Sequence, residues 1–327
     1  MPATHIGSRW NRPGFEGSLD FFRSDTGTSL FTLTKGGVVA LSPNPTGAAD
    51  YVVDGNVSST GDGSLAAPYL TLKEAITASN TSIGLTANRW WAKRNRIFVM
   101  GDQEIDEDLT VLPEKCDVIG IGTDLVPYPR VTGHHIIAAA AVGFRSINMG
   151  WNCDATTDLF VLPAGCHGTQ FIGGAMVPNV AGSTKALEIT SSAHVLIHGV
   201  EMVTNAGNHT AGIFAQGISM EGAAGSHQTR IEACFIRATE GIAIASTCLA
   251  ANTLIVGNYI HATAETINDE SSLAHVINNR LLSDASVALA AGAGGITCNE
   301  LLASGNKLGG KDTVTNADYP FVIQLTS

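Results

Sequence analysis

The feature of this sequence that most constrains its fold is an internal repeat of short apolar segments. Seven complete segments open on an apolar residue and carry another apolar residue five positions later, after a shorter first segment. Their first residues lie 26, 28, 25, 34, 24, 21 and 20 positions apart. A repeat at this spacing indicates a solenoid. The segments are Val118–Ile121, Phe144–Met149, Ile172–Val177, Ile197–Met202, Ile231–Ile236, Ile255–Ile260, Val276–Leu281 and Ile296–Leu301.

A single turn of this length, with short strands and no helix, cannot bury its own apolar side. Turns stacked at the ~4.8 Å spacing between strands share one core and pair their backbones in parallel sheets. The low aromatic content of 6% suits a narrow interior. The sequence therefore predicts an all-β fold, a right-handed parallel β-helix. A β-sandwich is the alternative, but it needs hairpin turns that this spacing does not provide.

An asparagine column marks the last three segments. Asn258, Asn279 and Asn299 fall at the same position of the repeat. Asparagine tolerates the left-handed backbone conformation, and its amide can bond to a stacked neighbour. The column is therefore expected at a sharp bend between strands.

Residues 1–49 differ in composition from the rest of the chain, and they are predicted to form an extended N-terminal arm for assembly. One strand is expected over 29–34, where apolar and polar residues alternate. Large aromatic residues on a segment without a core need a partner surface, so they are the predicted assembly contacts. These contacts are Trp10, Phe15, Phe21, Phe22 and Phe31.

Residues 50–327 are predicted to form the β-helix domain, with coils over about 96–305. Thr71 and Glu74 have capping-box spacing, so a short helix near 72–79 is expected to cap the solenoid. A solenoid end needs such a cover because it exposes core and unpaired strand edges. Within the tail, residues 306–327, the segment 319–325 is expected to add a last strand or to pack against another subunit.

The formal net charge of −11 disfavours binding to nucleic acid or to anionic lipid. The one basic cluster, residues 89–96, is interpreted as a solvated turn with tryptophan packed below it. No apolar run reaches the ~18 residues of a membrane span. The first residues do not resemble a secretion signal. Synthesis in a host cytoplasm, with no membrane partner, is therefore expected.

No catalytic centre is evident in the repeat. Glycosidases need two nearby carboxylates, which on a solenoid should occupy one column on neighbouring turns. Two columns of the repeat were compared, and neither holds stacked acids; Glu201 and Glu300 lie several turns apart. The acidic run 102–108 is interpreted as a solvated strand edge, and no calcium-binding loop pattern supports a metal there.

Histidine and cysteine patterns also point away from a metal site, and no cofactor is expected. The pairs His134–His135 and His194–His198 are interpreted as polar surface or turn residues. The six cysteines form no CxxC pair, so free buried thiols are expected. They are Cys116, Cys153, Cys166, Cys234, Cys248 and Cys298.

The opening of the β-helix domain resembles a known family. The motifs are Tyr51–Asn56, Gly61–Ser64 and Pro68–Ile76. They are similar to the start of pectate-lyase-like right-handed parallel β-helix proteins, especially those among the virion structural proteins of tailed bacteriophages. The resemblance covers roughly residues 50–305. Lyases, hydrolases, tailspikes and capsid-surface proteins share this fold, so the fold alone does not give the function.

The resemblance, the arm and the missing acid column together favour a virion structural protein. The expected function is a capsid decoration or cement protein that binds the outer head surface without catalysis. Its expected partners are the major capsid protein and sister subunits in a homotrimer. The alternative is a trimeric tailspike or receptor-binding protein, with or without polysaccharide depolymerase activity. A free polysaccharide lyase or hydrolase is a third hypothesis.

Overall fold

The structure of the chain is a computed structural model. Before residue 49 and after residue 284 it describes only strands and their pairing. The described residues are 6–9, 19–23, 29–33, 39–41, 49–83, 94–100, 104–111, 113–122, 129–178, 180, 182–203, 212–222, 228–248, 250, 252–271, 274–284, 296–297, 303–304 and 307–310.

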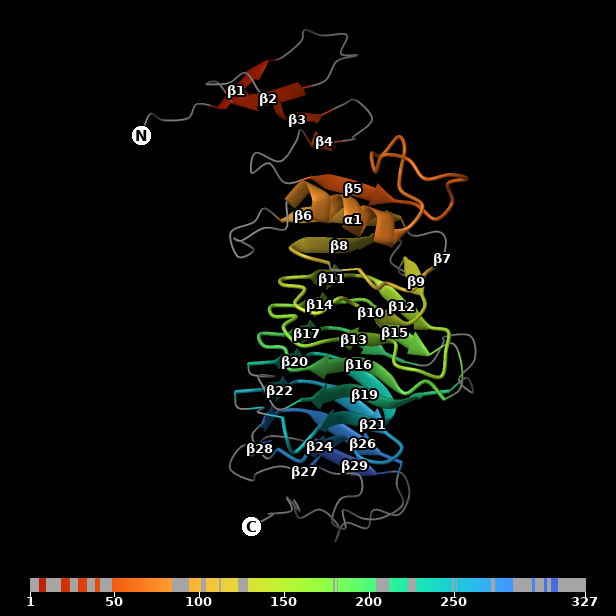
Figure 1. Cartoon of the computed structure of the whole chain (residues 1–327). Helices are drawn as coiled ribbons and strands as arrows, with labels where there is room; N and C mark the ends of the chain where they lie inside the picture. The colour runs from red at the N-terminus through yellow and green to blue at the C-terminus, as the bar shows by residue number, and fades with distance from the viewer. Residues whose placement is uncertain are drawn as a thin grey trace.

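The main body is a parallel β-helix, as the repeat predicts, and its strands stack into one long column (Figure 1). Its first face is a ten-stranded sheet in which each described pair is parallel. The strands of this first face are β5 (Asp50–Val53), β6 (Asn95–Met100), β8 (Cys116–Ile121), β11 (Arg145–Ile147), β14 (Gln170–Ile172), β17 (Leu196–His198), β20 (Arg230–Glu232), β22 (Leu254–Val256), β25 (His275–Ile277) and β28 (Ala303–Ser304).

The other two faces merge into one fifteen-stranded sheet through the long strand β21 (Phe235–Ile244). The first half of β21 belongs to the second face and its second half to the third face. The second face also contains β7 (Glu104–Asp106), β9 (Arg130–Thr132), β12 (Gly150–Cys153), β15 (Ala175–Pro178), β18 (Glu201–Met202), β23 (Tyr259–Ala262), β26 (Arg280–Ser283) and β29 (Lys307–Gly310). The third face also contains β10 (His135–Ile136), β13 (Phe160–Leu162), β16 (Lys185–Thr190), β19 (Phe214–Glu221), β24 (Ile267–Asp269) and β27 (Ile296–Thr297).

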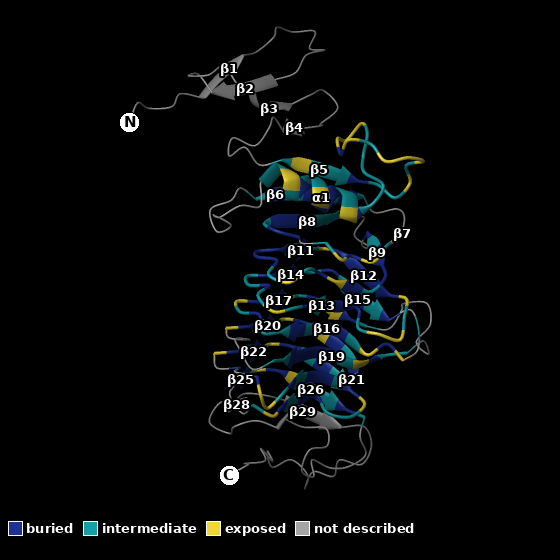
Figure 2. Cartoon of the chain, in the orientation of Figure 1, coloured by how far each residue is buried: buried dark blue, intermediate teal, exposed yellow. Residues whose placement is uncertain are grey.

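Inward side chains from the three faces form a single apolar core that runs through the stacked turns (Figure 2). On the first face, Ile197, Ile231, Ile255 and Val276 are aligned in register and are fully buried. The largest buried side chain is Trp151, whose indole nitrogen donates to the Ser146 hydroxyl at 2.9 Å. The three faces therefore share one apolar core.

Three segments of the repeat were aligned wrongly. Val118 stacks on Ser146 rather than on Phe144, and Ser146 stacks on Phe171 rather than on Ile172. Ile296 lies on β27 and pairs with Ile267, so it belongs to the third face. The apolar pattern alone does not give the register, because the polar Ser146 occupies the inward position of β11, and Phe171 and Ile172 are both apolar.

A left-handed residue follows each described first-face strand from β11 to β25. These residues have φ between 51° and 66°, and they are Asn148, Gly173, Gly199, Ala233, Gly257 and Asn278. The bend therefore falls one position before the asparagine column. Asn258 and Asn279 are buried and stacked, with the Asn258 amide nitrogen donating to the Asn279 side-chain oxygen at 2.9 Å. Asn299 lies outside the described residues.

The helix α1 (Leu72–Ile83) packs beside β5 and β6 at one end of the solenoid (Figure 1). It is one turn longer than the predicted span, 72–79. The Glu74 carboxylate accepts from the Thr71 backbone N–H at 3.1 Å, and the Thr71 hydroxyl accepts from the Glu74 N–H at 3.3 Å, so a capping box is present. Leu72 and Ile76 on α1 join the apolar core and cover its end.

The acidic run is only partly a solvated edge, since Glu107 binds the start of α1. Its carboxylate accepts from the backbone N–H groups of Leu72 at 2.7 Å and of Lys73 at 3.2 Å. Helix N-termini favour negative charge because their first N–H groups are unpaired. Burial is the largest influence on this carboxyl group and raises the pKa of Glu107. Chain segments 35 residues apart meet here, which the local sequence did not reveal.

Within the N-terminal segment, four strands form an antiparallel sheet where the sequence predicted one strand. These are β1 (Ile6–Arg9), β2 (Leu19–Arg23), β3 (Ser29–Leu33) and β4 (Val39–Leu41). They pair in sequence order, and no described strand pairing joins them to the solenoid. The predicted last strand in the C-terminal tail, around 319–325, lies outside the described residues.

Candidate functional site on the outer faces

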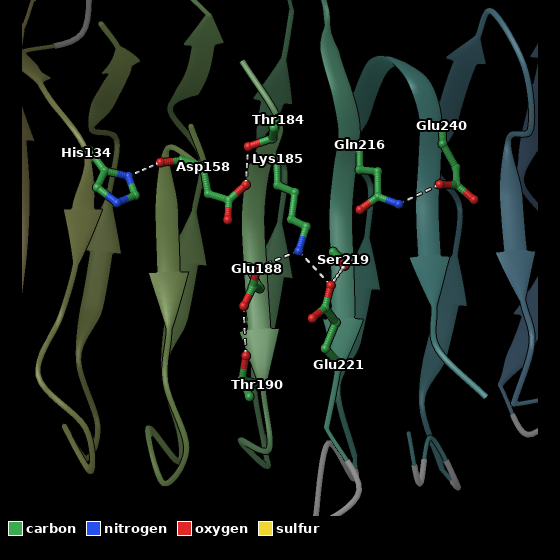
Figure 3. A network of polar contacts seen from close by, with 10 residues as sticks. All are labelled: His134, Asp158, Thr184, Lys185, Glu188, Thr190, Gln216, Ser219, Glu221 and Glu240. Carbon is green, nitrogen blue, oxygen red and sulfur yellow. Dashed lines mark hydrogen bonds and ion pairs between the residues drawn. The ribbon is translucent and has the colours of Figure 1, made fainter. Parts of the chain in front are cut away.

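The third face carries a network of polar side chains (Figure 3). At its centre, the Lys185 ammonium donates to Glu188 Oε2 and to Glu221 Oε1, both at 2.6 Å. Burial by itself lowers the pKa of Lys185, but its bonds to the two carboxylates outweigh that effect and raise it. The Thr190 and Ser219 hydroxyls donate to the same two carboxylates at 3.0 Å. The Lys185 ammonium is therefore paired with two carboxylates of its own chain.

The third face also brings two acidic residues side by side on neighbouring turns, which the sequence analysis missed. The Gly241 backbone N–H donates to the Glu265 carbonyl at 2.9 Å, which places Glu265 beside Glu240. Gln216 donates its side-chain amide to Glu240 at 2.6 Å. Burial, followed by the negative charges of Glu240 and Glu270, raises the pKa of Glu265. Two neighbouring carboxyl groups in different environments are able to serve as acid and base.

The signal for this pair was present in the sequence. Glu240 and Glu265 are 25 positions apart, close to the 24 positions that separate Ile231 from Ile255 on the first face. Only columns that follow the first-face strands were searched for acids. The number of residues between a first-face strand and the next third-face strand varies from turn to turn. The register of the third face is therefore known only from the structure. The two columns considered in the sequence do not include this pair.

The second face carries a ladder of stacked side chains. The rings of Phe235 and Tyr259 are parallel within 4°, with centroids 4.9 Å apart, and the Arg280 guanidinium lies 5.2 Å from the centre of the Tyr259 ring. The flat ring faces therefore contact one another and the guanidinium, so mainly ring edges reach solvent. Beside the ladder, His261 Nε2 lies 2.9 Å from the Asp284 carboxylate. This arrangement stabilises the stacked turns more directly than it offers a platform for a ring-shaped ligand.

The first face pairs the described members of the basic cluster with carboxylates. Arg96 donates two bonds to Asp50, at 2.6 and 2.7 Å, and Arg94 donates to Asp117 at 2.6 Å. Residues 84–93, with the tryptophans of this cluster, lie outside the described residues. The two described arginines therefore hold neighbouring turns together.

Three of the predicted assembly residues lie on two neighbouring strands of the N-terminal sheet. Phe21 and Phe22 lie on β2, and Phe21 pairs directly with Phe31 on β3. Directly opposite residues share one face of a sheet, so Phe21 and Phe31 are on the same face. Trp10 and Phe15 lie outside the described residues. The role of the five aromatic residues in assembly stays a prediction.

His135 differs most from its expected surface position. It is fully buried, and its ring centroid lies 5.0 Å from that of Trp151 and 5.6 Å from that of Phe160. Its Nδ1 accepts from the Leu109 backbone N–H at 3.2 Å, and its Nε2 has no hydrogen-bond partner among the described residues. Burial lowers the pKa of His135 to about 4. The ring is therefore a neutral core residue.

His194 and His198 lie at the surface, as the sequence predicts. His194 is an exposed turn residue with φ of 59°, and the exposed His198 lies 3.2 Å from Glu232. The five described cysteines are buried free thiols, and Cys298 lies outside the described residues. Within the described ranges, no group of three or more histidine, cysteine or acidic side chains is arranged to hold a metal ion. In the same ranges, no helix is long and apolar enough to cross a membrane.

Comparisons of this chain with protein-family models, with curated proteins and with solved structures give no match.

Proposed function

We propose that this chain is a structural protein of a tailed-bacteriophage virion, a capsid decoration or cement protein that binds the outer head surface. In this proposal the solenoid is a rigid body, and the N-terminal sheet is its attachment to the capsid shell. The partners are the major capsid protein and two sister subunits in a homotrimer. No chemical step is assigned to the protein.

One observation carries the proposal. The segment that the sequence marks for assembly forms its own antiparallel sheet, and its described strands pair only with one another. A small sheet of this kind is marginal without further packing, and large aromatic side chains contribute most when a partner buries them. Phe21 and Phe31 are directly paired residues of this sheet. The resemblance of residues 51–76 to phage β-helix proteins supports the virion context.

Removal of the N-terminal segment tests this assignment. A chain that begins at Ala49 keeps the contacts of that residue with Asn95 and Arg96, at 2.8 and 3.0 Å, so its solenoid should fold. We expect the shortened chain to keep its melting temperature within a few degrees and to lose binding to purified phage heads. Co-sedimentation with heads measures binding, and circular dichroism measures folding. The full-length chain is the control.

Two results would oppose this assignment. A shortened chain that aggregates or melts much earlier would show that the segment covers the solenoid. A shortened chain that stays folded and decorates heads normally would show that the segment is not the attachment.

The second candidate function is a tailspike or receptor-binding protein with depolymerase activity, and the stacked carboxylates of Glu240 and Glu265 favour it. The capsid proposal predicts no cleavage of acidic or neutral polysaccharides, with or without Ca²⁺. Size-exclusion analysis of the polysaccharides after incubation measures cleavage. Reproducible release of oligosaccharides would support the second candidate if Glu240→Gln or Glu265→Gln abolishes it and Glu201→Gln on the second face leaves it intact.

A further inference from the structure

The second and third faces meet along one edge, where β21 passes from one sheet to the other. Its first half pairs with β18 and β23, and its second half pairs with β19 and β24. Arg237 lies on the second-face part of this strand, and Glu240 follows three positions later, where it is in register with Gln216 on the third face. The same turns of the solenoid therefore contribute to both faces.

The third face has an excess of negative charge beside this edge. Glu240 and Glu265 are half-buried and Glu270 is exposed, and among the described residues none of the three forms an ion pair with a cation. The nearby Lys185 is already bound to Glu188 and Glu221. Burial is the largest cause that raises the pKa of Glu265, and the negative charges of Glu240 and Glu270 add to it.

The second face has uncompensated positive charge on the same part of the solenoid. Arg280 is exposed and lies over Tyr259, and no carboxylate among the described residues forms an ion pair with it. Arg237 is half-buried, and its Nε atom is buried without a described hydrogen-bond partner. These cations stand out on a chain whose net charge is −11. Buried guanidinium nitrogens are costly unless a partner satisfies them.

From this arrangement we infer that copies of the chain associate by docking the second face of one copy onto the third face of the next. The contact places Arg237 and Arg280 of one copy against Glu240 and Glu265 of its neighbour. It rests on the homotrimer of the proposed function and specifies the surfaces that form it. A contact between two different faces is heterologous, and it makes a ring when the rotation between copies closes.

The geometry of stacked turns fits this occupant. In a ring whose subunits are parallel, the same turns of each copy lie at the same height. Arg237 then faces the turn of Glu240, and Arg280 on β26 lies one turn from Glu265, a step of ~4.8 Å. Side chains of this length span that step. A second copy therefore supplies opposite charges at the same spacing as the turns of the first copy. Nothing requires the charges of a capsid protein to follow that spacing.

Charge reversal on each face tests the inference in the full-length chain. Light scattering coupled to size exclusion should give three times 33.9 kDa for the natural chain. Reversal of the second face by Arg237→Glu with Arg280→Glu, or of the third face by Glu240→Lys with Glu265→Lys, should give mainly single chains. All four substitutions together restore complementarity and should restore the trimer. Arg230→Glu, on the first face, is the matched control and should stay trimeric.

Folding is checked for each variant by circular dichroism, and Arg280→Gln with Glu265→Gln provides a milder pair that should weaken association several-fold. A natural chain that is monomeric at tens of micromolar would overturn the inference. A molar mass that stays at that of the trimer after either charge reversal would also overturn the inference. So would a chain with all four substitutions that does not form a trimer. The chain that begins at Ala49 separates this result from the proposed function, because it should lose head binding and remain trimeric.

Discussion

Replacement of Ile255 by alanine should lower the free energy of unfolding by about 2–5 kcal/mol. Ile255 is fully buried on β22, between Ile231 on the preceding turn and Val276 on the following one. The substitution leaves a cavity inside the shared core of the solenoid. Both neighbours are held in register by parallel strands, so the turns have little freedom to close around the cavity.

The matched control is Val256→Ala, at the next position of the same strand. Val256 is half-buried and lies on the outward side, so its truncation should cost well under half as much. Denaturant unfolding followed by circular dichroism measures both variants against the natural chain. If the two substitutions cost the same, or if Val256→Ala costs more, the inward column assigned here is incorrect.

Acidification should destabilise the protein by about 3 kcal/mol between roughly pH 6.5 and pH 4 through His135 alone. Burial lowers the pKa of this ring to about 4 in the folded chain. The unfolded chain takes up the proton near pH 6.5, whereas the folded chain resists it until about pH 4. The stability that the neutral ring contributes is therefore complete above pH 6.5, and it is lost as the pH falls through this window.

Substitution of His135 by glutamine should remove this share of the pH dependence. The glutamine oxygen is able to accept the Leu109 N–H, although the smaller contact with Trp151 and Phe160 should lower stability at every pH. Unfolding free energies at pH 7.5, 5.5 and 4.5 give the slope for each variant. His198→Gln is the control, because that histidine is exposed on the first face. An unchanged slope in His135→Gln would contradict the buried neutral ring.

The fold was readable from the sequence because a solenoid repeats one physical solution. Ile231, Ile255 and Val276 recur at a nearly constant spacing, and that spacing alone predicts parallel stacking and a shared core. The capping helix was readable too, since its signal in Thr71 and Glu74 is local. The register of the earlier turns was less accessible, because Phe144 and Phe171 are both apolar and buried. Only the strand pairing shows that Phe171 occupies the aligned column.

The outer faces were harder to predict because their chemistry depends on which strands meet. Glu107 binds a helix that starts 35 residues earlier, and Glu240 faces Glu265 on a sheet whose register the first-face repeat does not give. The burial of His135 arises from its alternation with His134 along one chain segment, which places one ring in the core and the other outside. Because both residues are histidines, the sequence did not indicate which of the two rings points into the core.

Imaging of purified virions with a gold label on this chain tests the central claim, its place on the capsid, most directly. The proposed function predicts label distributed over the head surface. Excess unlabelled full-length chain, added to the particles first, should not shift the gold label from the head to the tail. Label confined to the tail would contradict the decoration proposal and support the receptor-binding alternative, and virions without label would contradict both.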